Sequence, residues 1–202
     1  MCVFLTLRLF SQEFARISGN MSSLIGFELE RKNTNLKEVD LAALLEERFD
    51  VSIPPDLFLC ECKTFKDFNS KDAERMIELG EEFPNSILTF ATLKEKLSES
   101  EKKEIKKVVL HFQKGVGNRP INPVLILTSK ELLPDDMFDH FSDYEDITKP
   151  FNKFNDWIEN LAEFSIEKHL KMKTWGEIRT DIWKKAMEQR EQKQTTIMVK
   201  HK

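Results

Sequence analysis

Hydrophobic and polar residues alternate in three segments of the first third of the chain, and this period of two predicts β-strands. The segments are residues 24–31, 38–45 and 57–64. The first two are joined through Asn33-Thr34-Asn35, which is typical of a turn and predicts a hairpin. In the second segment four apolar side chains are expected on one face: Val39, Leu41, Ala43 and Leu45. Glu38 and Asp40 are expected on the opposite face.

The third segment separates its side chains into an apolar and a mixed face. One face carries Phe58, Cys60, Cys62 and Thr64, and the other carries Leu57, Leu59, Glu61 and Lys63. Glu61 and Lys63 are therefore neighbours, roughly 7 Å apart along the same face of the strand. Because two leucines precede them on that face, we expect a helix to bury much of it.

Other segments follow the helical period. Residues 3–18 are expected to form a helix with one buried stripe made of Phe4, Leu7, Phe10, Phe14 and Ile17. Asn69 or Ser70 is expected to cap a helix that ends near Phe83. A second capped helix, rich in lysine and glutamate, is expected from Ser98 or Ser100 to about Lys114.

Two short apolar segments, residues 87–92 and 124–128, predict buried strands. Their alternation with helices predicts parallel pairing. The fold class is therefore α/β, with a mixed central sheet flanked by helices in residues 1–133. Residues 134–202 are expected to add an acidic linker, C-terminal helices at 151–164 and 175–191, and a frayed basic tail. Six of the twelve residues from 135 to 146 are Asp or Glu.

Composition limits the function classes. Hydrophobic residues make up 40% of the chain and the mean hydropathy is −0.45, which predicts a soluble globular protein without a membrane partner. The N-terminal segment lacks the basic start of a signal peptide. Three cysteines, two of them one residue apart, give no disulfide framework and favour a reducing, cytoplasmic setting. The net charge of −4 gives no support to a nucleic-acid partner by itself.

The order helix, three strands, helix, strand, helix, strand, with Glu38-Val39-Asp40 on the second strand and Cys60-Glu61-Cys62-Lys63 on the third, resembles the PD-(D/E)XK nuclease superfamily. The similarity covers residues 3–130 and extends to the branch of Mrr-type restriction enzymes and Holliday-junction resolvases. It implies a restriction-endonuclease-like fold in which Asp40 and Glu61 hold Mg²⁺ or Mn²⁺. Lys63 then assists the attacking water. The resemblance also implies the backbone carbonyl of Cys62 as a ligand, and Glu13 as the first-helix acid that some relatives add.

The residues agree with these roles on physical grounds. Two carboxylates from paired strands suit a hard divalent cation that prefers oxygen ligands and keeps several waters. Such a cation stabilises charge on a phosphodiester, and a nearby lysine can orient water or stabilise the transition state. The prediction is a metal-dependent nuclease acting on DNA, in phage defence or DNA processing, although the residues do not distinguish DNA from RNA. A homodimer or a larger defence or repair complex is compatible with this function.

Alternatives remain at this level. Glu61 and Lys63 can be a solvated pair on a strand face, and Asp56 after Pro55 gives a literal Pro-Asp in place of Asp40, which we prefer. Cys60-X-Cys62 lacks the second ligand pair that zinc needs, so core thiols are favoured. The alternative function is a nuclease-like binding or structural subunit whose catalysis is weak or lost.

Overall fold

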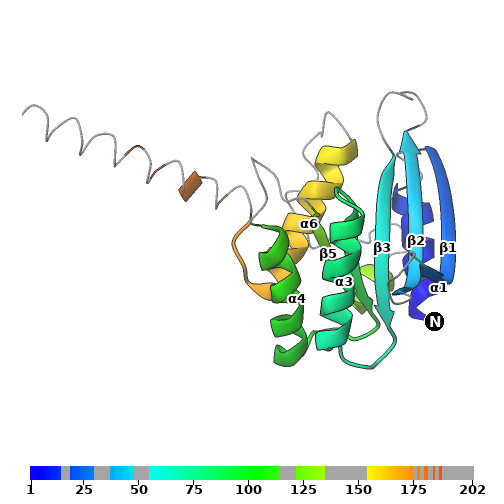
Figure 1. Cartoon of the computed structure of the whole chain (residues 1–202), viewed down its shortest axis with the longest axis horizontal. Helices are drawn as coiled ribbons and strands as arrows, with labels where there is room; N and C mark the ends of the chain where they lie inside the picture. The colour runs from blue at the N-terminus through cyan, green and yellow to red at the C-terminus, as the bar shows by residue number, and fades with distance from the viewer. Residues whose placement is uncertain are drawn as a thin grey trace, which may run out of the picture.

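A five-stranded mixed sheet forms the centre of the molecule in a computed structural model (Figure 1). The structure describes residues 1–14, 19–29, 37–47, 55–113, 122–134 and 154–174, and the single positions 177, 180, 181, 184 and 187. The strands are β1 (Gly19–Leu29), β2 (Lys37–Glu47), β3 (Asp56–Lys63), β4 (Ile87–Thr92) and β5 (Val124–Leu127).

The strands lie in the order β1-β2-β3-β4-β5. β1, β2 and β3 pair antiparallel, which confirms the predicted hairpin, and β3, β4 and β5 pair parallel. Parallel neighbours need a crossover connection. Helices α3 (Ser70–Glu82) and α4 (Glu99–Phe112) supply the two crossovers. The α/β class and the parallel pairing of the later strands are thus confirmed.

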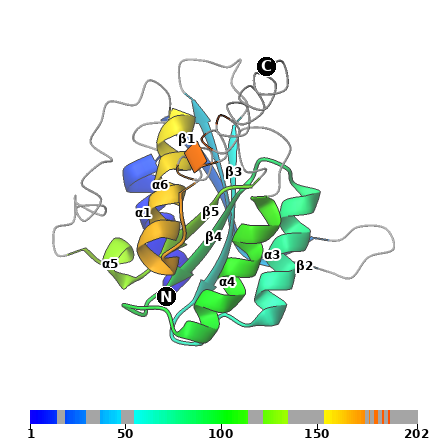
Figure 2. The same cartoon turned by 90° about the vertical axis from the view of Figure 1, so that its left-hand side faces the viewer.

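Helices cover both faces of the sheet (Figure 2). α3 and α4 lie on one face, and α1 (Cys2–Leu9), the short α5 (Ser129–Leu132) and α6 (Phe154–Leu170) lie on the other. Asn69 and Ser98 cap α3 and α4, each within a reciprocal capping box. Both predicted helix starts are therefore confirmed.

The buried side of the first helix differs from the prediction. Cys2, Thr6 and Leu9 are its buried residues, whereas Phe4 is 64% exposed. The helix is apolar on nearly every side, so the period alone does not single out its buried face. After Leu9 the chain changes to one π-helical segment, η1 (Phe10–Phe14), which includes the buried Phe10.

β2 changes faces at Asp40. Leu41 packs in the hydrophobic cluster on the α1 side of the sheet, whereas Val39 packs in the cluster on the α3 side. The prediction that Val39 and Leu41 share a face is therefore wrong. Opposite this point, β1 carries Gly26 at φ +57°, a left-handed conformation that glycine adopts without strain. The change of face on β2 thus coincides with Gly26 on β1, between the pairs Ile25–Leu41 and Phe27–Val39.

α6 closes the β5 edge of the sheet. Its Ile158 and Leu161 belong to the α1-side core, and Ile166 and Leu170 belong to the α3-side core. Ser165 Oγ accepts the Ile126 backbone N–H at 3.1 Å, so a helix side chain satisfies an edge group of the strand. This helix, assigned by sequence to a C-terminal extension, thus packs on the sheet.

Several predicted features lie outside the described residues. These are the turn at 33–35, the burial of Phe14 and Ile17, the acidic segment 135–146, most of the helix expected at 175–191, and the tail at 192–202. Among the helices that the structure describes, none has the length and apolar character needed to span a membrane.

Candidate functional site

The cysteines of β3 lie on one face of the strand and its leucines lie on the other, as the alternation of the sequence predicts. Cys60 packs in the α1-side core and Cys62 packs against it, whereas Leu57 and Leu59 pack on the α3 side. Glu61 and Lys63 share the α3 side, near the carboxyl end of the strand, where both contact α3. The interpretation of the cysteines as core thiols is consistent with this packing.

Glu61 is a buried carboxylate between two cations. Its residue is 1% exposed, which is incompatible with a solvated surface pair. The Lys63 ammonium lies 2.6 Å from Oε1 as an ion pair, and the Arg75 guanidinium donates to Oε2. Burial raises the pKa of Glu61 to about 7; Lys63 and Arg75 oppose this rise, and the Asp40 carboxylate adds to it.

Asp72 completes the group from the first turn of α3. Its Oδ1 lies 3.0 Å from Lys63 Nζ and 3.3 Å from Arg75 Nη2, and its Oδ2 accepts the Asn69 N–H at 2.9 Å within the capping box. Although burial opposes it, this backbone bond and the contact with Lys63 lower the pKa of Asp72. Glu61, Lys63, Asp72 and Arg75 are called the ion cluster below.

Burial also disfavours the charged forms of Lys63 and Arg75. Their contacts with Glu61 and Asp72 nevertheless raise the pKa of both side chains. The two cations therefore stay charged at neutral pH, and the ion cluster contains two cations and two acids.

Asp72 and Arg75 are the site residues that the sequence analysis missed. Their spacing of three places them on one face of α3. Since α3 starts just after β3 and covers its face, two charged residues on the inward side of its first turns were the available signal.

The Asp40 side chain contacts the backbone of β3. The pairing of β2 with β3 runs from Leu45 opposite Asp56 to Leu41 opposite Cys60. One residue beyond this pairing, Asp40 Oδ2 accepts the Cys62 N–H at 2.7 Å. The carboxylate therefore lies beside the strand that carries Glu61 and Lys63, close enough to affect the pKa of Glu61.

The remaining predicted residues lie at different distances from the ion cluster. Asp56 starts β3 opposite Leu45, five residues before Glu61 and therefore roughly 16 Å away along the strand. This position favours Asp40 over Asp56 as the second acid. Glu13 lies in η1, the π-helical segment that follows α1.

The carboxylates of the candidate site meet some of the requirements of a divalent-cation site. Asp40 and Glu61 offer carboxylate oxygens, and Mg²⁺ is commonly bound by one or two carboxylates with waters completing its shell. Within the described ranges, no three Asp, Glu, His or Cys side chains are grouped for metal binding. A metal at Glu61 would compete with Lys63 and Arg75 for the carboxylate oxygens.

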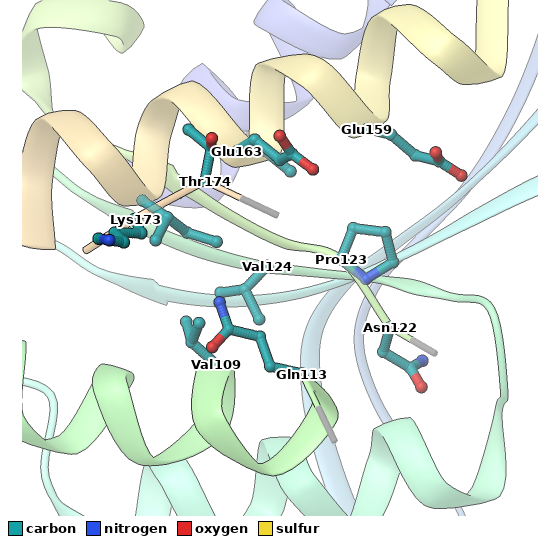
Figure 3. A pocket seen from close by; sticks show the side chains of 11 residues that line it. Val109, Gln113, Asn122, Pro123, Val124, Glu159, Glu163, Lys173 and Thr174 are labelled. Carbon is teal, nitrogen blue, oxygen red and sulfur yellow. The ribbon is translucent and has the colours of Figure 1, made fainter. Parts of the chain in front are cut away.

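A pocket lies elsewhere in the molecule, between the end of α4, the start of β5 and α6 (Figure 3). Its volume is about 520 Å³ including the space at its open mouth, and Val109, Val124, Glu163 and Lys173 are among its lining residues. Asp40 and the ion cluster do not line it. Perturbed, buried titratable groups are a better guide to chemistry than depth alone, so we place the candidate site at the ion cluster.

Comparison of the chain with protein-family models, with curated proteins and with solved structures finds no match in any of the three.

Proposed function

We propose that this protein is a metal-dependent nuclease that hydrolyses DNA phosphodiester bonds with Mg²⁺ or Mn²⁺. The main support for this proposal is that the Asp40 side chain, from β2, binds the backbone of β3 beside Glu61 and Lys63. The order of elements supports the proposal, since a helix, an antiparallel three-strand meander, a crossover helix and a parallel strand are what a PD-(D/E)XK fold requires. The three cysteines are free thiols, which suits a cytoplasmic protein.

In this proposal each residue has a role that its position allows. Asp40 and Glu61 would hold the cation, together with the Cys62 carbonyl, and the cation would stabilise charge on the phosphodiester and lower the pKa of water. Lys63, partly exposed and next to Glu61, orients the attacking water or stabilises negative charge in the transition state.

Cleavage assays test this assignment. Wild type is incubated with single-stranded, duplex and branched DNA, and with RNA, in Mg²⁺, Mn²⁺ or EDTA. We expect metal-dependent cleavage that falls by about a hundredfold or more in Glu61→Ala and Lys63→Ala. Lys71→Ala is the matched control, because Lys71 is an exposed residue of α3 outside the ion cluster. Cleavage that survives both site substitutions would overturn the assignment.

A second candidate function is a nuclease-like binding subunit without catalysis. The observation in its favour is that both oxygens of Glu61 already face cations from the protein, which compete with a metal. Retained binding of nucleic acid with no cleavage of any substrate in either metal would select this function.

A further inference from the structure

Arg75 has more hydrogen-bonding capacity than its contacts use. Its Nη2 contacts Glu61 and Asp72, while Nε is buried and has no hydrogen-bond partner among the described residues. A guanidinium offers five N–H donors in a fixed fork, and buried polar atoms are normally paired. The contacts with Glu61 and Asp72 therefore leave part of the donor capacity of the guanidinium unused.

Both oxygens of the carboxylate that Arg75 contacts face a cation. The Lys63 ammonium lies 2.6 Å from Glu61 Oε1, and the Arg75 guanidinium donates to Oε2. A divalent cation at Glu61 would therefore have to displace one of these two contacts.

The cations are the accessible members of the ion cluster. The side chains of Lys63 and Arg75 are 21% and 24% exposed, whereas those of Glu61 and Asp72 are 2% and 5% exposed. An anionic ligand that approaches α3 from solvent therefore meets the cations first. Lys63 is a point charge, while the planar fork of Arg75 matches two oxygens of one phosphate.

We propose that Arg75 is a phosphate-binding residue that serves as the counter-ion of Glu61 until a divalent cation replaces it. A cation at Glu61 and the Arg75 guanidinium compete for the same carboxylate, so metal binding releases the fork to a phosphodiester oxygen of the substrate. This inference rests on the proposed nuclease function and adds a substrate contact from α3. The opposing interpretation is that Arg75 only neutralises Glu61 and stabilises the fold.

The two interpretations predict different affinities for Mn²⁺ and for DNA, and both affinities can be measured without turnover. Mn²⁺ affinity is measured by calorimetry on the full chain without DNA, and DNA affinity is measured in Ca²⁺ as a function of salt. The variants are Arg75→Gln, which removes the charge, and Arg75→Lys, which keeps the charge but not the fork. Lys71→Gln is the control, since it removes a charge from an exposed position of the same helix.

We expect opposite effects on the two ligands. Arg75→Gln should bind Mn²⁺ about tenfold more tightly, because the competitor of the metal is gone. It should bind DNA about tenfold more weakly, with the slope of log affinity against log salt reduced by about one. Arg75→Lys should bind Mn²⁺ like wild type and DNA about fivefold more weakly, and it keeps the test valid if Arg75→Gln does not fold.

The outcomes separate this inference from the proposed function. If wild type cleaves DNA but Arg75→Gln and Arg75→Lys match it in DNA affinity, the inference fails and the nuclease function stands. Weaker Mn²⁺ binding by folded Arg75→Gln also overturns the inference, because it would make the guanidinium a support of the metal site. Wild type that binds neither Mn²⁺ nor DNA overturns the proposed function itself.

Discussion

Asp40 has a structural contact at the place where two strands separate. Its carboxylate accepts the Cys62 N–H at 2.7 Å, one residue beyond the last pair of the β2–β3 ladder. The bond satisfies a backbone donor that the ladder no longer pairs, and it fixes Asp40 beside Glu61. The same side chain is therefore expected to support both the fold and the proposed chemistry.

Two substitutions of Asp40 separate these contributions. Asp40→Asn keeps an oxygen that can accept the Cys62 N–H, so its free energy of unfolding should lie within about 0.5 kcal/mol of wild type. Asp40→Ala removes the acceptor and should lower the free energy of unfolding by about 1–3 kcal/mol. Metal-dependent cleavage should be lost in both, because each lacks the charge. Urea unfolding and cleavage assays measure the two effects, and equal stability of Asp40→Ala and wild type would contradict the structural role.

At the scale of elements, close packing between α3, β4 and α4 depends on Gly80. A Cβ atom at this position would lie 2.4 Å from Phe112 Cζ and 3.0 Å from Leu88 Cδ1. Leu88 is fully buried and Phe112 is 4% exposed, so neither side chain can move into solvent without loss of burial. The glycine thus sets the distance between the two crossover helices.

Gly80→Ala should therefore destabilise the protein in spite of the better helix propensity of alanine. Overpacking costs about 1–3 kcal/mol, and the propensity gain of about 1 kcal/mol offsets part of it. We expect a net loss of up to about 2 kcal/mol in the free energy of unfolding, measured by urea unfolding. Phe112→Leu shortens the contacting side chain, so Gly80→Ala should lower the free energy of unfolding less in this background. An equal loss in both backgrounds would refute the steric explanation.

The elements also show which parts of the site the sequence could predict. The alternation of β3 predicts that Glu61 and Lys63 share a face, because a strand with a constant period allows no other arrangement. The direction of Asp40 could not be predicted in this way, since the strand changes faces between Val39 and Leu41. Arg75 and Asp72 were missed because their contacts depend on how α3 crosses β3, which is a tertiary property.

At the scale of the whole molecule, Glu131 joins the sheet to its last described helix. Its Oε2 accepts from the Thr128 N–H and hydroxyl at 2.8 and 2.7 Å within the capping box of α5. Its Oε1 lies 3.0 Å from Lys168 Nζ and 3.3 Å from His169 Nε2, both on α6. A 1% exposed carboxylate thus connects the turn after β5 to the helix that covers the β5 edge.

The charge of Glu131 should make this connection sensitive to acid. Burial alone would raise the pKa of Glu131, but the contacts with His169, Thr128 and Lys168 hold it well below its usual range. The folded state therefore binds the proton less readily than the unfolded chain does. The resulting stabilisation is present above the unfolded pKa of about 4.3 and is lost as the pH falls below that value.

Glu131→Gln should for this reason be destabilised most at neutral pH. We expect a loss of about 2–4 kcal/mol in the free energy of unfolding at pH 7, since Lys168 loses a buried partner. The gap between variant and wild type should narrow as the pH is lowered from about 4.5 toward 3. Urea unfolding across this range measures the gap, with Glu167→Gln as the control because Glu167 is an exposed acid of α6, next to Lys168. A gap that stays constant with pH would mean that the Glu131 side chain acts through its shape and hydrogen bonds, and that its charge does not hold α6 to the sheet.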